Sequence, residues 1–428
     1  MDIENRTSDI DIKQDDVFDA NAKDNGILII GGVCGIINLG NTCYMNAGLQ
    51  CIMGTDVFAT YFLKRHYMND LKHGIIKKLK KNNLKINKNE FREIFKNTIT
   101  YKFRTLVIFI WGTQCMLKPE SFKKNFSQVN TRFSGYSQED SHEFVMSLLD
   151  IIHEETKTDV IFELTLEPNL KQFKNIYDDF NAKLLMQNLS PDDKILIAKN
   201  FEKFKNSDLE TYIMYESLVS WQYHIKNNHS CIIDIFTALI LSEVCCCACS
   251  NKTIKFDPMT TLTLEIGNSQ TNINKCFENF CNGENIDYNC KNCNNTKATK
   301  KLSLWHTPPR LIISLKRFQQ MNARFFAKNN NLITFPLENF NLMEYIHPFN
   351  KTNEVYDLYG IVQHLGSYNG GHYIAFTKNM LNNNWYRYDD DKVIKINNDD
   401  IEKYIMTPNT YMLFYAKKGN VNLVTIDN

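Results

Sequence analysis

The sequence changes from glycine-rich to helical at Asn41-Thr42-Cys43-Tyr44-Met45-Asn46-Ala47-Gly48-Leu49-Gln50-Cys51-Ile52. Met45, Leu49 and Ile52 recur at helical spacing, and Thr42 carries the hydroxyl that an N-cap uses. The pattern therefore predicts a helix that begins at or next to Cys43. A helix N-terminus favours a thiolate through its dipole and its free N–H groups. Cys43 is thus a candidate nucleophile, although a buried core thiol is the simpler interpretation of any single cysteine.

The composition excludes several classes of protein. The chain has 428 residues and 13 cysteines, and its 49 basic and 48 acidic side chains give a formal net charge of +1. This balance disfavours an overall nucleic-acid or membrane-surface binder, so neither partner is expected. Residues 1–24 hold eight acidic and three basic side chains and no apolar signal-peptide core, which predicts a cytoplasmic or nuclear location. In those compartments thiols stay reduced, so cysteines are interpreted first as metal ligands, nucleophiles or core residues.

Two Cys-x-x-Cys pairs form a candidate metal site: Cys246 with Cys249, and Cys290 with Cys293. Thiolates spaced in this way can bind one ion from a tight turn, and two such turns complete a tetrahedral zinc site. Within its run of cysteines, Cys246 alone has a partner three positions further along. Four unmetallated thiols and a redox pair are the alternatives. The gap between the pairs is longer than in a compact zinc ribbon, so the sequence does not prove that they meet.

A histidine and an aspartate could complete a catalytic site with the cysteine. His372 begins a strand-like run after two glycines, and Asp389 ends the next strand-like run. A cysteine protease needs a base and a side chain that orients the base. Adjacent antiparallel strands could place these two side chains next to each other. Taken singly, His372 is equally well a turn residue, and Asp389 part of the acidic turn Asp389-Asp390-Asp391.

Several segments, taken together, resemble the ubiquitin-specific proteases, a papain-like family of deubiquitinases. The segment Gly35-Ile36-Ile37-Asn38-Leu39-Gly40-Asn41-Thr42-Cys43-Tyr44-Met45-Asn46 resembles their cysteine box, and Ser137-Gln138-Glu139-Asp140-Ser141-His142-Glu143-Phe144 their glutamine box. Three further segments resemble the histidine box of the family: His364-x-Gly366, Gly370-Gly371-His372-Tyr373 and Trp385-x-x-Tyr388-Asp389-Asp390. The segment from Pro308-x-x-Leu311 through Leu315-Lys316-Arg317-Phe318 resembles the strand that follows the zinc-binding cysteine pairs in this family. These motifs occur in family order over roughly residues 31–418.

The resemblance implies an α+β, papain-like cysteine protease with a thumb, a palm and zinc-bearing fingers. The expected divisions are a disordered acidic tail at 1–26, a catalytic domain at 27–418 and a short C-terminal tail at 419–428. The thumb is expected at about 31–220, the fingers at about 230–302, and the palm in the remainder. Residues 157–220 match no family motif and are expected to be an insertion or an elaborated linker.

The resemblance also assigns catalytic roles by position. Cys43 would be the nucleophile, His372 the base and Asp389 the residue that orients it. Asn38 would donate to the oxyanion, and Asp390 would support the site. The four paired cysteines would bind one structural zinc ion, because every ligand position is a thiolate. The other eight cysteines are interpreted as plain small residues: Cys34, Cys51, Cys115, Cys231, Cys245, Cys247, Cys276 and Cys281.

The implied partners are ubiquitin and ubiquitinated proteins, bound by a monomer. Asp140 would contact the basic tail of ubiquitin, and Tyr373 would line the channel for its Gly-Gly end. His364 could face the same channel, with a structural role as an equal alternative. Two departures from the family pattern are notable. Glu139 adds a charge near the channel, and Ala47-Gly48 places a helix-weakening glycine one turn past the nucleophile.

The expected activity is therefore thiol-dependent hydrolysis of the bond after the C-terminal Gly-Gly of ubiquitin, through an acyl-enzyme. Three alternatives remain open at this stage. The chain could cleave another ubiquitin-like modifier, or bind ubiquitin as a catalytically silent scaffold. A non-enzymatic zinc module is the third, and the nucleophile motifs argue against it.

Overall fold

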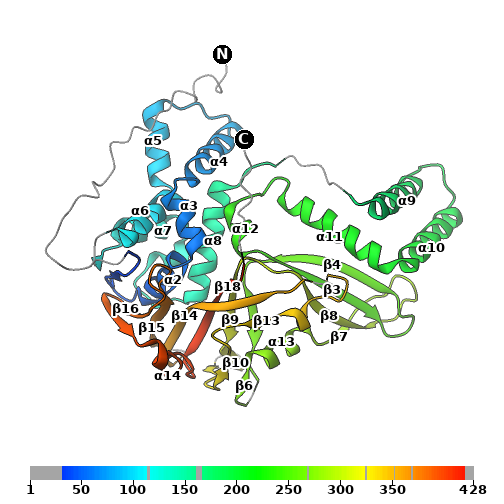
Figure 1. Cartoon of the computed structure of the whole chain (residues 1–428). Helices are drawn as coiled ribbons and strands as arrows, with labels where there is room; N and C mark the ends of the chain where they lie inside the picture. The colour runs from blue at the N-terminus through cyan, green and yellow to red at the C-terminus, as the bar shows by residue number, and fades with distance from the viewer. Residues whose placement is uncertain are drawn as a thin grey trace.

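The computed structural model describes residues 31–112, 116–160, 166–267, 269–322, 325–350, 352–367 and 370–419. The expected tail at 1–26, nearly all of the tail at 419–428, and Cys115 lie outside these ranges. Most helices lie in the upper part of the view in Figure 1, and an eight-stranded and a four-stranded sheet lie below them, with smaller strand pairs beside these sheets. This mixed architecture confirms the α+β expectation. Every described helix is too short or too polar to cross a bilayer.

The thumb is a helical layer around an aromatic-rich core. Its helices are α2 (Cys43–Met53), α3 (Asp56–Leu63), α4 (Tyr67–Lys81), α5 (Lys88–Asn97), α6 (Ile99–Trp111), α7 (Glu120–Val129) and α8 (Ser141–Thr156). A 3-10 helix, η1 (Thr131–Ser134), follows α7, and the short strands β1 (Gly35–Ile36) and β2 (Met116–Leu117) pair in parallel. Helix α2 is buried at every position, so the cysteine at its start is fixed from all sides.

The palm is an eight-stranded sheet that carries the histidine box. Its strands are β5 (Leu262–Glu265), β9 (Arg310–Lys316), β13 (Phe340–Asn341), β14 (Val355–Ser367), β15 (Gly370–Lys378), β16 (Trp385–Asp389), β17 (Lys392–Ile396) and β18 (Thr410–Lys417). They run in the order β17-β16-β15-β14-β18-β9-β5, with β13 paired to β14. All neighbours are antiparallel except β5 and β9. Helix α2 packs on this sheet, and a Cβ on Gly360 would lie 3.5 Å from the Cys51 thiol.

The fingers are a second, four-stranded antiparallel sheet in the order β4-β3-β8-β7. Its strands are β3 (Ala238–Cys246), β4 (Lys252–Met259), β7 (Glu284–Asp287) and β8 (Lys297–His306). Alternation along β3 divides its apolar residues between two cores. Ile240 faces the core that contains α13 (Ile273–Cys281), whereas Leu239 and Leu241 face the opposite side. Both cysteine pairs lie in turns at the end of this sheet.

Three helices fill most of the region without a family motif: α9 (Pro168–Leu184), α10 (Pro191–Ser207) and α11 (Leu209–Ile225). They extend away from the thumb over the fingers sheet (Figure 1). Helix α11 packs on that sheet through Ile213, which joins Leu239, Leu241 and Phe256 in one core. Phe173 stacks on Phe204 at 4.7 Å to fasten α9 to the end of α10. The expected thumb range of about 31–220 therefore includes helices that pack on the fingers.

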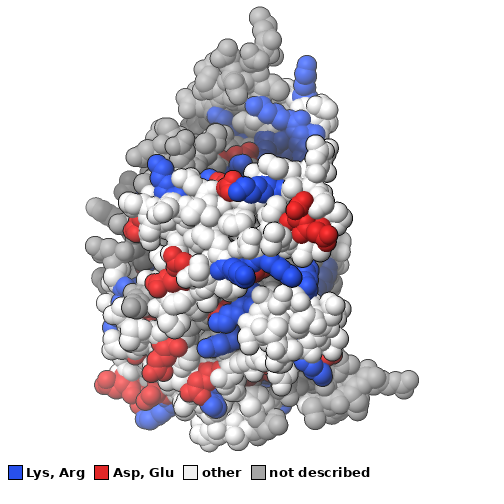
Figure 2. All heavy atoms as spheres, turned by 90° about the vertical axis from the view of Figure 1, so that its right-hand side faces the viewer, with Lys and Arg blue, Asp and Glu red and all other residues white. Residues whose placement is uncertain are grey.

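The remaining elements connect these layers. They are α12 (Cys231–Phe236), α14 (Ile401–Ile405), the 3-10 helices η2 (Met343–Tyr345) and η3 (Asn398–Asp400), and the strand pairs β10 (Phe318–Asn322) with β11 (Phe325–Lys328) and β6 (Thr271–Asn272) with β12 (Ile333–Thr334). Basic and acidic side chains are interspersed on the face shown in Figure 2. That mixture agrees with the balanced charge of the sequence.

Candidate active site and metal centre

Cys43 is the first residue of α2, as the helical spacing predicts. Thr42 stands at the predicted N-cap position, although its side chain makes no capping hydrogen bond. The Thr42 hydroxyl instead accepts a hydrogen bond from the Leu39 N–H at 2.9 Å. The reason is the turn before the helix, in which the Asn38 side-chain oxygen accepts from the N–H groups of Gly40 and Thr42. The Thr42 hydroxyl is thus occupied within this turn, and the same hydrogen bonds hold Asn38 close to Cys43.

The Cys43 thiol is buried, with 3% of the residue exposed. Burial raises the pKa of this thiol above its ordinary value, and the nearby Asp390 carboxylate raises it further. Backbone N–H groups of Tyr373, Tyr44 and Cys43 itself act in the opposite direction. The helix start alone predicts a lowered pKa, and desolvation reverses that direction. The thiol is therefore neutral at rest and needs a base to become a nucleophile.

The predicted base and the carboxylate predicted to orient it are in contact. His372 lies near the start of β15, and its Nε2 is 2.7 Å from Asp389 Oδ1 at the end of β16. Because Nε2 contacts Asp389, the other ring nitrogen, Nδ1, is the one available to accept the proton of the thiol. Cys43 is next to this histidine, because its thiol interacts with the backbone N–H of Tyr373. Among the described residues no hydrogen bond joins the Cys43 and His372 side chains, a looseness common before substrate binds.

The Asp389 carboxylate has a second partner that sequence reasoning missed. Arg387 donates from its Nη2 to Asp389 Oδ2 at 2.6 Å. Both residues lie on β16 two positions apart, so they project from the same face of the strand. The only sequence signal was this i, i+2 spacing of opposite charges within the histidine box.

Asp390 holds two asparagine side chains on the nucleophile's side of the site. Its Oδ2 accepts from Asn38 Nδ2 at 2.9 Å, and its Oδ1 accepts from Asn46 Nδ2 at 2.8 Å. The backbone of Asp390 is in the left-handed region, with φ of 54°, in the turn between β16 and β17. That turn sends the Asp389 side chain toward His372 and the Asp390 side chain toward Asn38. Asn46 was not among the expected site residues.

Gln138 joins the thumb to the strand of the base. Its side-chain oxygen accepts from the Gly371 N–H at 2.8 Å, and its side-chain nitrogen donates to the Gly371 carbonyl at 2.5 Å. Gly371 directly precedes His372, so this pair of bonds fixes the start of β15 against the segment before α8. The sequence showed Gln138 inside a motif but gave no sign of this partner.

The three expected substrate contacts lie around the same strand. Tyr373 and His364 are both buried, and their ring centroids are 4.6 Å apart. Burial, with Lys328 and His372 nearby, lowers the pKa of His364 to about 4, so its ring is neutral. Asp140 caps α8 by accepting from the Glu143 N–H at 3.0 Å, and it accepts from the Tyr411 hydroxyl at 2.5 Å. Both Asp140 oxygens are thus already used within the chain.

Glu139, which replaces a glutamine of the family motif, forms a charge cluster with thumb residues. Arg132 Nε is 3.4 Å from Glu139 Oε2, and the same guanidinium contacts Glu143. The added negative charge is therefore balanced by Arg132 within the thumb.

The four paired cysteines meet at the end of the fingers. Their sulfur atoms all lie within 4.8 Å of one another, and the Cys246–Cys293 and Cys249–Cys290 separations are both 3.6 Å. A disulfide requires about 2.05 Å, so these contacts are not disulfides. Tetrahedral zinc with bonds of about 2.3 Å places its sulfurs about 3.8 Å apart. The donor set therefore fits a zinc ion, and the structure brings together the two pairs whose meeting the sequence left open.

The two turns have the same backbone design. The N–H of Ser250 donates to the Cys246 carbonyl, and the N–H of Asn294 donates to the Cys290 carbonyl. Ser250 and Asn294 share a left-handed φ of 55°. This repetition aims two sulfurs from each turn at one centre. Cys245 and Cys247 belong to the same run of cysteines but lie outside the cluster.

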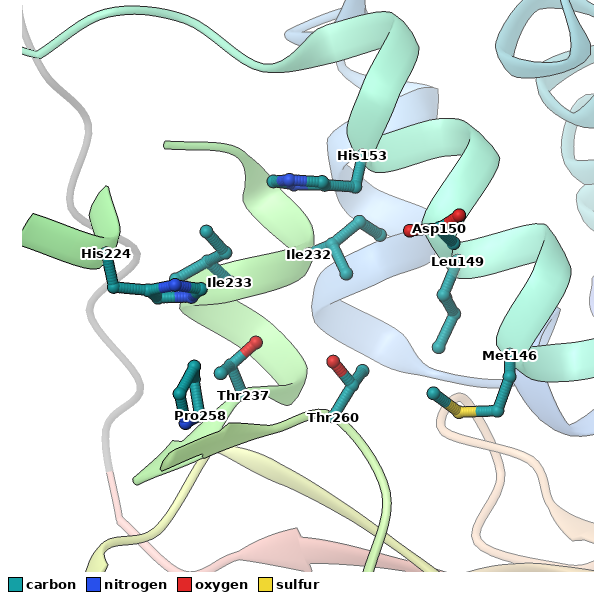
Figure 3. Close-up of a pocket in the computed structure, with 10 residues that line it drawn as sticks. All are labelled: Met146, Leu149, Asp150, His153, His224, Ile232, Ile233, Thr237, Pro258 and Thr260. Atoms are coloured by element: carbon teal, nitrogen blue, oxygen red, sulfur yellow. The ribbon is translucent and has the colours of Figure 1, made fainter. Parts of the chain in front are cut away.

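A cavity of about 210 Å³ lies at the junction of thumb and fingers, between α8, α11, α12 and β4 (Figure 3). His153, His224 and Asp150 are among its lining residues. Burial lowers the pKa of both histidines, and His153 Nδ1 is 2.7 Å from the Ser230 hydroxyl. None of Cys43, His372 and Asp389 lines this cavity, so it is distinct from the cysteine–histidine site.

Comparison with known proteins agrees with this geometry. The model of the ubiquitin carboxyl-terminal hydrolase family matches residues 34–415. The chain therefore belongs to this family of cysteine deubiquitinases, as its motifs predict. The Acanthamoeba polyphaga mimivirus protein named "Probable ubiquitin carboxyl-terminal hydrolase R319" is 27% identical, over 92% of this chain and 92% of that protein. Human ubiquitin carboxyl-terminal hydrolase 2 is 28% identical, over 90% of this chain but 55% of that protein.

Solved structures show the same fold. The SAGA DUB module of Ubp8, Sgf11, Sus1 and Sgf73 bound to monoubiquitin matches with a TM-score of 0.60 and 22% identity. The match covers 95% of this chain and 73% of that one. The same module bound to ubiquitin aldehyde also has a TM-score of 0.60, covering 92% of this chain and 71% of that one. The likeness supports the thumb, palm and fingers architecture.

Proposed function

We propose that this protein is a deubiquitinase that cleaves the amide or isopeptide bond after the C-terminal Gly-Gly of ubiquitin. The observation that carries the proposal is the 2.7 Å contact of His372 Nε2 with Asp389, beside the helix-start thiol of Cys43. A cysteine protease requires these three groups in this order of contact. Family membership and the ubiquitin-bound structural relatives support ubiquitin as the substrate.

In acylation, His372 Nδ1 takes the proton of the Cys43 thiol, and the sulfur attacks the carbonyl carbon of the last glycine. Asp389 stabilises the imidazolium and stays ionised itself. The imidazolium then gives its proton to the leaving amine as the C–N bond breaks. In deacylation, His372 takes a proton from water, and the hydroxide attacks the thioester. The C–S bond then breaks, and the imidazolium returns its proton to the Cys43 sulfur. The products are free ubiquitin carboxylate and the regenerated thiol.

Asn38 is the proposed side-chain donor to the oxyanion. Its amide nitrogen has two hydrogens, and one of them is directed to Asp390 Oδ2. Fixed in this way, the second hydrogen can meet the developing negative charge together with backbone N–H groups near Cys43. A donor of this kind contributes about 2.7–4 kcal/mol of transition-state stabilisation.

The approach to the site favours a tail of two glycines. Gly371 lies between Gln138 and the buried His364, where a Cβ would come 2.3 Å from His364 Nε2. Tyr373 adds a buried wall next to the thiol. We assign Tyr373 to the tail channel and Asp140 to the basic part of the tail, for which it would exchange its Tyr411 contact. His364 supports the channel wall from beneath.

The zinc ion is proposed to be structural. All four ligand positions are thiolates, which leaves no position for a water or substrate. Bound there, it would hold the two turns together at the end of β3 and β8 and so stiffen the fingers. One zinc ion per chain, a monomeric state, and a cytoplasmic or nuclear location complete the proposal.

The test is labelling with a ubiquitin probe that carries a C-terminal electrophile, together with hydrolysis of a fluorogenic ubiquitin amide. Wild type is expected to react with both, and Cys43→Ala with neither. Cys247→Ser, which alters an exposed thiol outside the site, serves as the matched control and should keep full activity. Activity that persists in Cys43→Ala would refute the nucleophile assignment.

Two further outcomes separate the alternatives. Faster reaction with a probe made from another ubiquitin-like modifier would move the substrate away from ubiquitin. Ubiquitin binding by wild type without turnover would indicate a silent scaffold.

A further inference from the structure

The carboxylate of Asp389 is held from two sides. His372 Nε2 contacts Oδ1 at 2.7 Å, and Arg387 Nη2 contacts Oδ2 at 2.6 Å. Each oxygen therefore has its own charged or chargeable partner. Arg387 and Asp389 are equally exposed, each with 28% of its side chain accessible. The pair lies at the edge of the site, where solvent competes for the carboxylate.

The backbone alone does not fix this carboxylate beside the base. The ladder between β15 and β16 ends at the pair Ala375–Tyr388, before it reaches His372. The contact between His372 and Asp389 is thus made by side chains alone. Asp389 is also the last residue of β16, directly before the left-handed turn at Asp390. A carboxylate at a strand end can rotate about its Cβ–Cγ bond unless its second oxygen is held.

The other charged groups around His372 and Asp389 do not replace Arg387. Asp390 has both oxygens occupied by Asn38 and Asn46. Lys392 lies opposite Asp389 in the β16–β17 ladder, yet within the described chain no ion pair joins the two. His364 interacts electrostatically with His372 but is buried and neutral. Among the described lysine and arginine residues, Arg387 is therefore the one that contacts the Asp389 carboxylate.

We infer that Arg387 is a positioning residue that holds the Asp389 carboxylate in the orientation His372 needs. The inference rests on the proposed deubiquitinase function. By holding Oδ2, the guanidinium keeps Oδ1 aimed at Nε2 while the Cys43 proton moves to Nδ1. No proton or bond changes at Arg387 in this step. Its positive charge opposes the imidazolium, but it lies on the far side of the carboxylate and is screened by water, so the positional effect dominates.

The experiment compares Arg387→Gln, Arg387→Lys and the control Lys392→Gln in steady-state hydrolysis of a fluorogenic ubiquitin amide. Arg387→Gln is expected to lower kcat by about 5- to 20-fold with KM nearly unchanged, because only the chemical step is affected. Arg387→Lys keeps a cation within reach and should recover part of the loss. Lys392→Gln removes a nearby cation that forms no ion pair with Asp389 among the described contacts. The kcat of this variant should stay within about 2-fold of wild type.

A double-mutant cycle separates positioning from a structural role. If Arg387 acts through Asp389, then Arg387→Gln in an Asp389→Asn background should lower kcat by less than about 2-fold. An equal drop in both backgrounds would overturn the inference, and so would an unchanged kcat in Arg387→Gln.

A second readout needs no ubiquitin. Alkylation of Cys43 by iodoacetamide, quantified by mass spectrometry of its peptide, reports the thiolate that His372 and Asp389 help to form. The rate in Arg387→Gln should fall toward that of Asp389→Asn. If wild type failed to hydrolyse ubiquitin, the proposed function would fall, whereas this alkylation series would still decide the role of Arg387. Equal rates in wild type and Arg387→Gln would count against it.

Discussion

Asp390 and Asn38 are joined by a 2.9 Å hydrogen bond between the carboxylate of one and the side-chain amide of the other. The contact spans most of the chain and links the turn after β16 to the turn before α2. It ties the predicted oxyanion donor to the residue that follows Asp389, the contact of His372. The turn at Asp389-Asp390 therefore contacts the predicted base through Asp389 and the predicted oxyanion donor through Asp390.

The first prediction concerns this bond. Asp390→Asn places an amide opposite two amides, so one of the contacts to Asn38 and Asn46 is lost. We expect kcat for ubiquitin amide hydrolysis to fall by about 10- to 100-fold, because an oxyanion donor loses its anchor. Asp389→Asn should be more damaging, since it removes the charge that stabilises the imidazolium.

Steady-state kinetics of both variants test this order. The matched control is Asp391→Asn, an exposed neighbour in the same turn, which should retain wild-type kcat. A larger loss in Asp390→Asn than in Asp389→Asn would exchange the roles of the two residues.

The second prediction concerns the metal. Purified protein should contain one zinc ion per chain by elemental analysis, and the double variant Cys246→Ser/Cys290→Ser should contain none. Loss of the metal should also lower the melting temperature, because binding free energy at such a site is folding free energy. Cys247→Ser changes an adjacent cysteine outside the cluster and should retain the zinc. Zinc retained by the double variant would refute the site.

The third prediction concerns Gly48, whose presence in a helix looks unfavourable from sequence. A Cβ at this position would lie 2.9 Å from Val145 Cγ2 and 3.2 Å from Phe144 Cδ1 on α8. Gly48→Ala gains about 1 kcal/mol of helix propensity but incurs an overpacking cost of about 1–3 kcal/mol. We expect a net loss of up to about 2 kcal/mol in the free energy of unfolding, measured by urea denaturation. Gly48→Ala/Val145→Ala should relieve the clash, and a stabilised Gly48→Ala would contradict the packing argument.

Local patterns predicted the parts of the site that depend on local structure. The helix at Cys43, the strands of His372 and Asp389, and the cysteine turns all follow from spacing within short segments. The ordered motifs then identified the fold. The packing of the 157–220 region on the fingers depends on Ile213 meeting Leu239 and Leu241, which no local pattern encodes.

Contacts between distant segments were beyond the sequence. Gln138 bonding to Gly371, and Asp390 bonding to Asn46, each join residues more than two hundred positions apart. The hydrogen bond of the Thr42 hydroxyl was equally beyond the sequence, although its partner Leu39 is only three residues away. That partner depends on the exact path of the preceding turn. Burial of Cys43 likewise reversed the pKa direction that its helix position implied.

The fourth prediction concerns Gly371, the residue before the base. A Cβ there would lie 2.3 Å from His364 Nε2 and 2.4 Å from the Leu365 carbonyl oxygen. Gly371→Ala must therefore displace the start of β15 and with it His372. We expect at least about a 100-fold loss of kcat/KM, since small displacements of reacting groups have effects of this size. Gly267→Ala, where a Cβ meets nothing within 4 Å, is the control, and near-normal activity of Gly371→Ala would show that the strand tolerates the shift.

The fifth prediction is a loss of stability in acid. Burial lowers the pKa of His364 to about 4 in the folded protein, against about 6.5 when unfolded. Between these values the unfolded chain binds a proton that the folded chain does not, so the free energy of unfolding falls as pH drops from 6.5 to 4. A shift of this size corresponds to about 3 kcal/mol. Burial also lowers the pKa of other histidines, which adds to the effect: His142, His153, His224, His306 and His347.

Urea unfolding at a series of pH values measures this slope. His364→Gln should flatten the loss between pH 6.5 and 4, whatever its effect on stability at pH 7. His229 supplies a control of opposite sign. Burial lowers its pKa, but the hydrogen bond and charge of Asp234 outweigh burial and raise it. The stabilisation from His229 is therefore present at low pH and lost as pH rises, so His229→Gln should steepen the acid loss. An unchanged slope in His364→Gln would mean that its ring is protonated in the folded state.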